Sequence, residues 1–194
     1  MLRHAALAIL AAALPLGAQT LQDLNGLKAE ARHFVSTGLS SSGENRKTEL
    51  YRIIGDPGPV SPGLLQRGVD VLHWRFQYKI LERNPGPGAM EAAQHRQCWA
   101  DCLRGVFTNF EYSDVIVTDA RPIEHAWIAV GLDEAIGELK KHGYTHGFEK
   151  VTLMRPMHPA LPDEFVYIFQ CPVEKTQVAI STQTGALMWK ESWN

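Results

Sequence analysis

The sequence predicts an α+β fold made of two tandem units, each an amphipathic helix packed on a small curved antiparallel β-sheet. Residues 21–35 and 132–142 both show the apolar spacing of a surface helix. Each of these stretches is followed by short runs rich in β-branched and aromatic residues, which favour strands. Residues 97–107 can also be laid without a gap on residues 177–187, with Gln at the first position and Gly at the ninth of both. We therefore expect one order of elements to occur twice.

The N-terminus has the three parts of a secretory signal peptide. A basic start at residues 1–4 precedes an Ala, Leu and Ile run at residues 5–16, and the small residue Ala18 stands at a plausible cleavage point. The apolar run is too short to span a bilayer, and the absence of a Cys near the cleavage point argues against a lipid anchor there. We expect residues 1–18 to be removed, the first unit to cover residues 19–121 and the second to cover residues 122–194. The mature protein would then be periplasmic or secreted.

The charge and composition exclude some classes of partner. The formal net charge is −2, and loss of Arg3 with the signal peptide would leave 18 basic and 21 acidic residues, a net charge of 18 − 21 = −3. So weak a negative charge gives no electrostatic reason to expect binding to nucleic acid or to an anionic membrane. The chain has no second long hydrophobic segment, so we expect no integral membrane segment after signal cleavage.

In the first unit, the helix at 21–35 is followed by a strand at 47–54, a Pro-rich loop at 55–63 and a strand at 69–81. The strand at 69–81 has the clearest alternation in the chain. One face carries Leu72, Trp74, Phe76, Tyr78 and Ile80, and the other carries His73, Arg75, Gln77 and Lys79. The first row should be core; the polar row is a solvated surface or a binding face. A loop at 82–96 and strands at 97–107 and 108–118 complete the unit.

The second unit begins after a junction at 119–122, because Pro122 disfavours helix at the residue before it. Its helix at 132–142 has Gly143 as a natural C-terminal cap. A strand at 148–155 and a loop at 156–162 lead to an antiparallel meander at 165–189, whose last turn contains Thr184 and Gly185. We expect a positive φ at Gly185, because tight hairpin turns require one.

The second unit resembles the PepSY-type module, found in peptidase propeptides and in many exported bacterial proteins. The resemblance is carried by residues 127–136, by Gly143 and by the hairpin at 178–187. In that family the hairpin commonly reads Val-x-Val-Asp-Ala-x-Thr-Gly-x-Val, and here Ser181 and Thr182 replace Asp-Ala while Thr184 and Gly185 are kept. The resemblance implies a helix packed on a small curved sheet, and a role in binding or restraining other proteins outside the cytoplasm.

The same resemblance is weaker in the first unit, which keeps Asp101 and Gly105 but has Arg104 in place of Thr. It supplies no catalytic residues for either unit. The chain also lacks a Gly-x-Ser-x-Gly elbow, a Walker loop and a dinucleotide-binding fingerprint. We therefore expect no enzyme, no catalytic residues and no cofactor.

Two groups of residues are candidate sites. The chain has three cysteines, so one disulfide together with one free thiol is possible. Cys98 is expected on an extended strand and Cys102 at the turn that follows, which places them too far apart for a disulfide with each other. They also lack the Cys-x-x-Cys spacing of a redox motif. His142 and His146 have the spacing of two helical metal ligands, but Gly143 closes the helix between them. His158 is nearby in the sequence, so a weak surface metal site stays open. Scattered surface histidines and structural cysteines are the simpler interpretation, so we expect no metal.

The sequence thus predicts an exported, non-catalytic binding or regulatory module that acts on an unknown protein partner, either a peptidase or a cell-envelope protein. The alternative is a periplasmic protein that binds a metal or a small ligand through Cys98, Cys102 and histidines.

Overall fold

The computed structural model describes residues 23–41, 46–59, 63–81, 95–117, 121–123, 125–156 and 163–194, and for residues 95 and 114–117 it describes the backbone alone. The expected signal peptide at 1–18 lies outside these residues. So do most of the expected loops at 82–96 and 156–162, including His158, and part of the expected junction at 119–122.

The described residues form two α-helices, one short 3₁₀ helix and eight strands. In chain order the elements are α1 (Leu24–Ser41), β1 (Lys47–Asp56), η1 (Gly68–Asp70), β2 (His73–Leu81), β3 (His95–Leu103), β4 (Val106–Val117), α2 (Leu132–Lys141), β5 (Lys150–Met154), β6 (Val166–Cys171), β7 (Thr176–Ser181) and β8 (Leu187–Ser192).

All eight described strands belong to one antiparallel sheet, in the order β4-β3-β2-β1-β5-β6-β7-β8. The joint is between β1 and β5, where Ile53 pairs with Leu153 and Gly55 pairs with Val151. The prediction of two tandem units, each with its own small sheet, is therefore wrong. In two separate sheets β1 and β5 would both be edge strands with unpaired backbone N–H and C=O groups, and pairing them with each other satisfies both rows.

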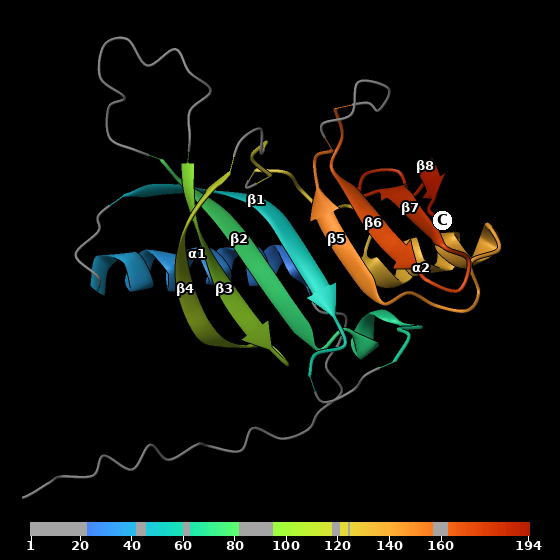
Figure 1. Cartoon of the computed structure of the whole chain (residues 1–194), viewed down its shortest axis with the longest axis horizontal. Coiled ribbons are helices and arrows are strands. Elements are labelled where there is room, and N and C mark those ends of the chain that lie inside the picture. Colours follow the sequence, from blue (N-terminus) through green and yellow to red (C-terminus); the bar gives the residue numbers. More distant parts are fainter. Residues whose placement is uncertain are drawn as a thin grey trace, which may run out of the picture.

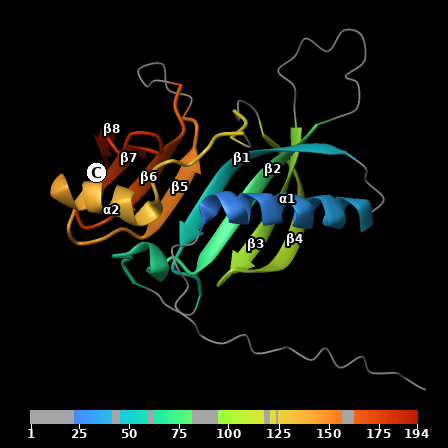
Figure 2. The same ribbon diagram turned by 180° about the vertical axis from the view of Figure 1, so that it is seen from behind.

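Both helices lie on the same face of this sheet. Seen from behind, α1 crosses β1 to β4 and α2 lies in front of β5 to β8 (Figure 2). From the other side no helix stands in front of the strands (Figure 1). The sheet therefore has one covered face and one face that neither helix protects, which we call the open face.

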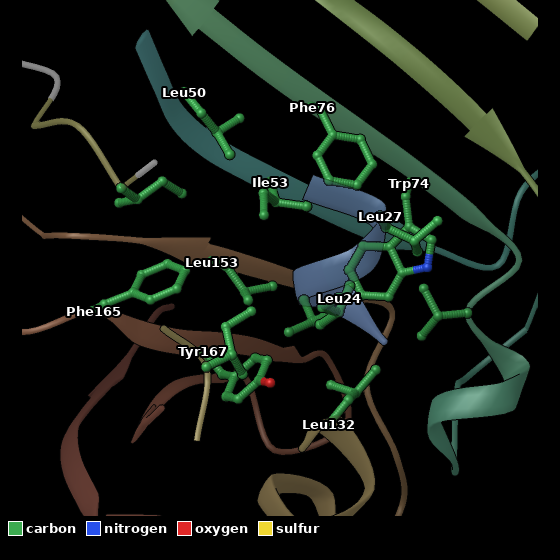
Figure 3. Close-up of a cluster of buried hydrophobic side chains, with 14 of the residues drawn as sticks. Leu24, Leu27, Leu50, Ile53, Trp74, Phe76, Leu132, Leu153, Phe165 and Tyr167 are labelled. Atoms are coloured by element: carbon green, nitrogen blue, oxygen red, sulfur yellow. The ribbon is translucent and has the colours of Figure 1, made fainter. Parts of the chain in front are cut away.

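A single hydrophobic core fills the covered face. The alternation in β2 is confirmed, since Trp74, Phe76, Tyr78 and Ile80 are fully buried. Leu72, which was expected in the same row, precedes β2 and is only partly buried. Side chains from both halves of the chain meet in one cluster at the centre of the sheet (Figure 3). Its members there include Leu24 and Leu27 of α1, Ile53 of β1, Leu132 of α2, Leu153 of β5 and Tyr167 of β6. This shared core is a second reason why the two halves are not separate units.

The turns follow the local sequence closely. Gly143, just after α2, has a φ of 93°, and the backbone N–H groups of Gly143 and Tyr144 donate to carbonyls in the last turn of the helix. Gly185 has a φ of 73°, as expected. In that turn the hydroxyl oxygen of Ser181 accepts hydrogen bonds from the backbone N–H groups of Gln183 and Thr184, at 3.1 and 3.0 Å. A short polar side chain at position 181 therefore caps the hairpin.

The turn between β3 and β4 lies later than the sequence predicted. It is formed by Arg104 and Gly105, whose φ angles are 51° and 82°, while Cys102 lies inside β3. Positive φ at both central residues is the pattern of a type I′ hairpin.

Candidate functional site

The open face is built by the strand residues that point away from the helices. Successive side chains on a strand point to opposite faces, so the neighbours of the buried residues face outward. The strand register places these outward residues in two rows across the sheet. One row contains Glu111, Trp99, Gln77, Arg52, Met154 and Val166, and the next contains Asn109, Asp101, Arg75, Ile54, Thr152, Ile168, Ala179 and Trp189.

The first half of the open face carries a network of paired charges. Arg75 binds Asp101 with two hydrogen bonds, from Nε to Oδ1 at 2.8 Å and from the terminal nitrogen to Oδ2 at 3.1 Å. The hydrogen bond to Asp101 raises the pKa of Arg75 above its ordinary value, so the guanidinium of Arg75 stays charged. Lys79 forms a second pair with Glu49, with 2.9 Å between Nζ and Oε2.

His73 extends this network between two carboxylates. Its Nδ1 atom lies 3.1 Å from Oδ2 of Asp56, and its Nε2 atom lies 3.3 Å from Oδ1 of Asp101. Both ring nitrogens can donate at once in the imidazolium form. Three residues of the polar row that the sequence assigned to β2, His73, Arg75 and Lys79, thus each lie against a carboxylate from β1 or β3.

Three polar side chains of the same face have atoms without a partner. Trp99, Gln77 and Arg52 lie side by side on β3, β2 and β1. Within the part of the chain that the structure describes, Nε1 of Trp99, Oε1 of Gln77 and Nε of Arg52 are buried and have no hydrogen-bond partner. Buried polar atoms in native structures are nearly always paired, so three unpaired atoms in one row call for an explanation.

Beside this row the open face is apolar. Ile54, Ile168 and Trp189 lie in one row with Thr152 between them, and Met154 lies next to Arg52. These side chains are half-buried. An apolar strip, which runs from Ile54 on β1 to Trp189 on β8, therefore adjoins the charged network on β1 to β4.

The cysteines lie elsewhere, within the core. Cys98 and Cys102 on β3 pair in register with Tyr78 and Trp74. These two cysteines and Cys171 on β6 are fully buried, and the three form no disulfide. Burial raises the pKa of Cys102 to about 11 and that of Cys171 to about 12. Thiols with such pKa values stay protonated at neutral pH and are poor nucleophiles and metal ligands.

His142 and His146 are exposed residues, and each is paired with a carboxylate. His142 lies 3.3 Å from Glu138, and His146 lies 2.8 Å from Glu174. Across the described ranges there is no group of three or more His, Cys, Asp or Glu residues that could hold a metal ion. The structure therefore does not bring Cys98 and Cys102 together with His142 and His146.

A cavity of about 250 Å³ lies on the covered side, where the N-terminal ends of α1 and α2 approach each other. Its polar groups are already used within the protein. Asn25 exchanges two hydrogen bonds with the backbone of Ile128, and the N–H of Gly68 donates to Asp133 at 2.6 Å. The hydroxyl of Tyr167 donates to the carbonyl of Val130 at 2.9 Å. These contacts hold the two halves together, and we do not assign a ligand to this cavity.

The sequence matches no family model, and it matches no curated protein. Among solved structures, the crystal structure of a "putative lipoprotein" from Clostridium difficile 630 shares 6% identity, with a TM-score of 0.45, over 82% of this chain and 90% of that chain. A likeness of this size assigns no family and no function. In the described part of the chain, none of the helices has the length and apolar character needed to cross a membrane.

Sequence reasoning put Gln77 in a row that is either a solvated surface or a binding face, and it missed Arg52. The register between β1 and β2 shifts between Leu50 and Arg52, and this irregularity buries both Leu50 and Tyr51 before Arg52 turns to the open face. An unbroken alternation would put Leu50 and Arg52 on one face. The sequence contains no signal that marks this shift.

Proposed function

We propose that this protein is an exported, non-catalytic binding module that contacts a protein partner, a peptidase or a cell-envelope protein, through the open face of its sheet. The observation that carries the proposal is the row formed by Trp99, Gln77 and Arg52, with its three unpaired polar atoms, on a face that neither helix covers.

The size of this face suits a macromolecule. Eight strands spaced by about 4.8 Å make a surface roughly 34 Å across. An interface of ordinary size needs about 800 Å² from each partner, which such a face can supply. Trp and Arg are enriched among the residues that dominate protein interfaces. Arg52 lies on β1, a central strand of the sheet, and borders the apolar strip at Met154, while Trp99 lies two strands away on β3.

The charged groups of the face fit a binding role better than proton transfer. Arg75 and Asp101 hold each other in two hydrogen bonds, and His73 is enclosed between Asp101 and Asp56. Such mutual pairing gives a surface a fixed charge pattern, which contributes specificity to association. The signal peptide expected at residues 1–18 supports a role outside the cytoplasm.

A photo-crosslinking experiment tests the proposal. Benzoylphenylalanine is placed at Thr152, on the open face, or at Ser36, an exposed position on α1, and the producing cells are irradiated. We expect a protein adduct from position 152 and none from position 36. The absence of an adduct at 152, or equal adducts at both positions, would overturn the proposal. Turnover of a substrate by the purified mature protein, lost on replacing one side chain, would also overturn it.

A further inference from the structure

We infer that Arg52 receives a carboxylate of the partner, so that the surface docking on the open face is acidic at the point where it meets β1. This inference rests on the proposed function and adds the chemistry of the partner to it.

Arg52 differs from the other cations of the open face in its charge environment. Arg75 is paired with Asp101 and Lys79 with Glu49. Lys150 on β5 is exposed, so water solvates its charge. Arg52 is half-buried, and among the described residues it has no carboxylate partner; its guanidinium lies 5.6 Å from the ring centre of Tyr51. A partly desolvated cation without a counter-ion is unfavourable until a carboxylate reaches it.

The unpaired atoms define the chemistry of the acceptor. The guanidinium of arginine is a planar fork of five N–H donors that matches a carboxylate, and in Arg52 the Nε–H is unused. Trp99 offers a second unused N–H, two strand spacings or roughly 10 Å away. One carboxylate cannot reach both, and we place it at Arg52, whose terminal guanidinium nitrogens are not among the buried unpaired atoms. Gln77, between them, can donate or accept through its amide.

The apolar residues beside Arg52 favour a protein segment over a free anion. Met154 is its cross-strand neighbour on β5, and Ile54 lies two residues further along β1. A partner side chain that packs on these two residues would exclude water from the adjacent charge pair and strengthen it. The fitting occupant is a segment in which Asp or Glu stands next to an apolar residue.

A stability measurement tests the state of Arg52 without the partner. Replacing a cation that lacks a counter-ion should leave the stability of the fold unchanged or increase it. Replacing a cation that is paired with a carboxylate should decrease it. We expect Arg52→Met to melt at or above the wild-type temperature. Arg75→Met, on the same face, should melt lower by about 4 °C, because it leaves the largely buried Asp101 without its arginine. Equal losses in the two variants would mean that Arg52 has a structural role, and would overturn the inference.

A binding measurement tests the partner. Arg52→Gln, Arg52→Lys and Lys150→Gln are introduced into the protein carrying benzoylphenylalanine at Thr152. Arg52→Gln and Lys150→Gln remove the same charge from the same face. We expect the adduct to fall at least about tenfold in Arg52→Gln, to fall less in Arg52→Lys, and to stay within about twofold of the parent in Lys150→Gln.

The outcomes separate the inference from the proposed function. If position 152 gives no adduct in the parent, the proposed function fails. If the adduct is present and insensitive to Arg52→Gln, the proposed function stands and the inference is overturned. Once the crosslinked segment is sequenced, exchanging its Asp or Glu for Asn or Gln should weaken binding as much as Arg52→Gln does, with no further loss when both changes are combined. If the two changes weaken binding independently, so that the fold-losses of the single variants multiply in the combined variant, the inference is overturned.

Discussion

Replacing Gly55 by Ala tests the packing at the centre of the single sheet. Gly55 lies on β1 opposite Trp74 of β2 and Val151 of β5. A Cβ atom at this position would lie 2.6 Å from Cζ3 and 2.9 Å from Cε3 of Trp74, and 2.8 Å from Cγ1 of Val71. These distances are shorter than carbon atoms tolerate. Trp74 is fully buried, so its ring can move aside only by displacing other core side chains.

The expected change in the free energy of unfolding is the sum of two opposing contributions. Overpacking a tight core by one methyl group costs about 1–3 kcal/mol. Ala also restricts the unfolded chain more than Gly does, which returns about 0.4–1 kcal/mol. The net effect of Gly55→Ala is a destabilisation of roughly 1–2 kcal/mol, which lowers the melting temperature of a chain of this size by about 2–8 °C.

Gly137→Ala is the matched control, since it makes the same chemical change at a different kind of position. Gly137 is an exposed residue inside α2, and a Cβ there meets nothing within 4 Å among the described atoms. Ala favours a helix interior over Gly by about 0.5–1 kcal/mol, so this variant should be more stable than wild type.

Urea unfolding of the mature protein, followed by tryptophan fluorescence, measures both effects. We expect opposite signs for Gly55→Ala and Gly137→Ala, and a changed near-ultraviolet circular dichroism signal for Gly55→Ala alone. Wild-type or higher stability in Gly55→Ala would refute the placement of Trp74 over β1, and with it the shared core at the joint of the sheet.

Three further predictions concern turns and thiols. Gly185→Val places a β-branched residue at a φ of 73° and should lower the melting temperature, with a loss of about 1–3 kcal/mol; unchanged melting would contradict the strained turn. Arg104→Asn should raise stability by up to about 1 kcal/mol, because Asn tolerates the φ of 51° better than Arg, and a lower melting temperature would count against it. The pKa values of Cys102 and Cys171, raised to about 11 and about 12, predict slow alkylation at about pH 8 in the native protein and fast alkylation in guanidinium chloride. Fast native labelling of either thiol, mapped by mass spectrometry, would show that it is not buried.

Local features of the fold could be predicted from the sequence because they depend on neighbouring residues. The alternation in β2 indicated which side chains are buried, since the period of a strand is a property of its backbone. Gly143 and Gly185 marked a helix end and a turn, because both positions need a positive φ. The apolar spacing indicated where α1 and α2 begin, although α1 extends to Ser41, beyond the expected end at residue 35.

Which strands pair with each other became known only from the tertiary structure. Backbone hydrogen bonds between strands do not depend on particular side chains. The residue types at 47–56 and 150–154 therefore do not predict that β1 and β5 pair. Where the sequence predicted two small sheets, the tertiary structure has one sheet and one core.

The candidate site, too, was predictable from the sequence only in part. Arg52, Gln77 and Trp99 are separated by 25 and 22 positions in the chain, and they become neighbours because β1, β2 and β3 pair in this register. The residue types and the strand period can be read from the sequence. The register shift at Leu50, which turns Arg52 away from the core, and the placement of both helices on the opposite face are outcomes of packing the whole chain. A polar residue in a strand is therefore visible in the sequence, but its lack of a partner depends on which strands lie beside it.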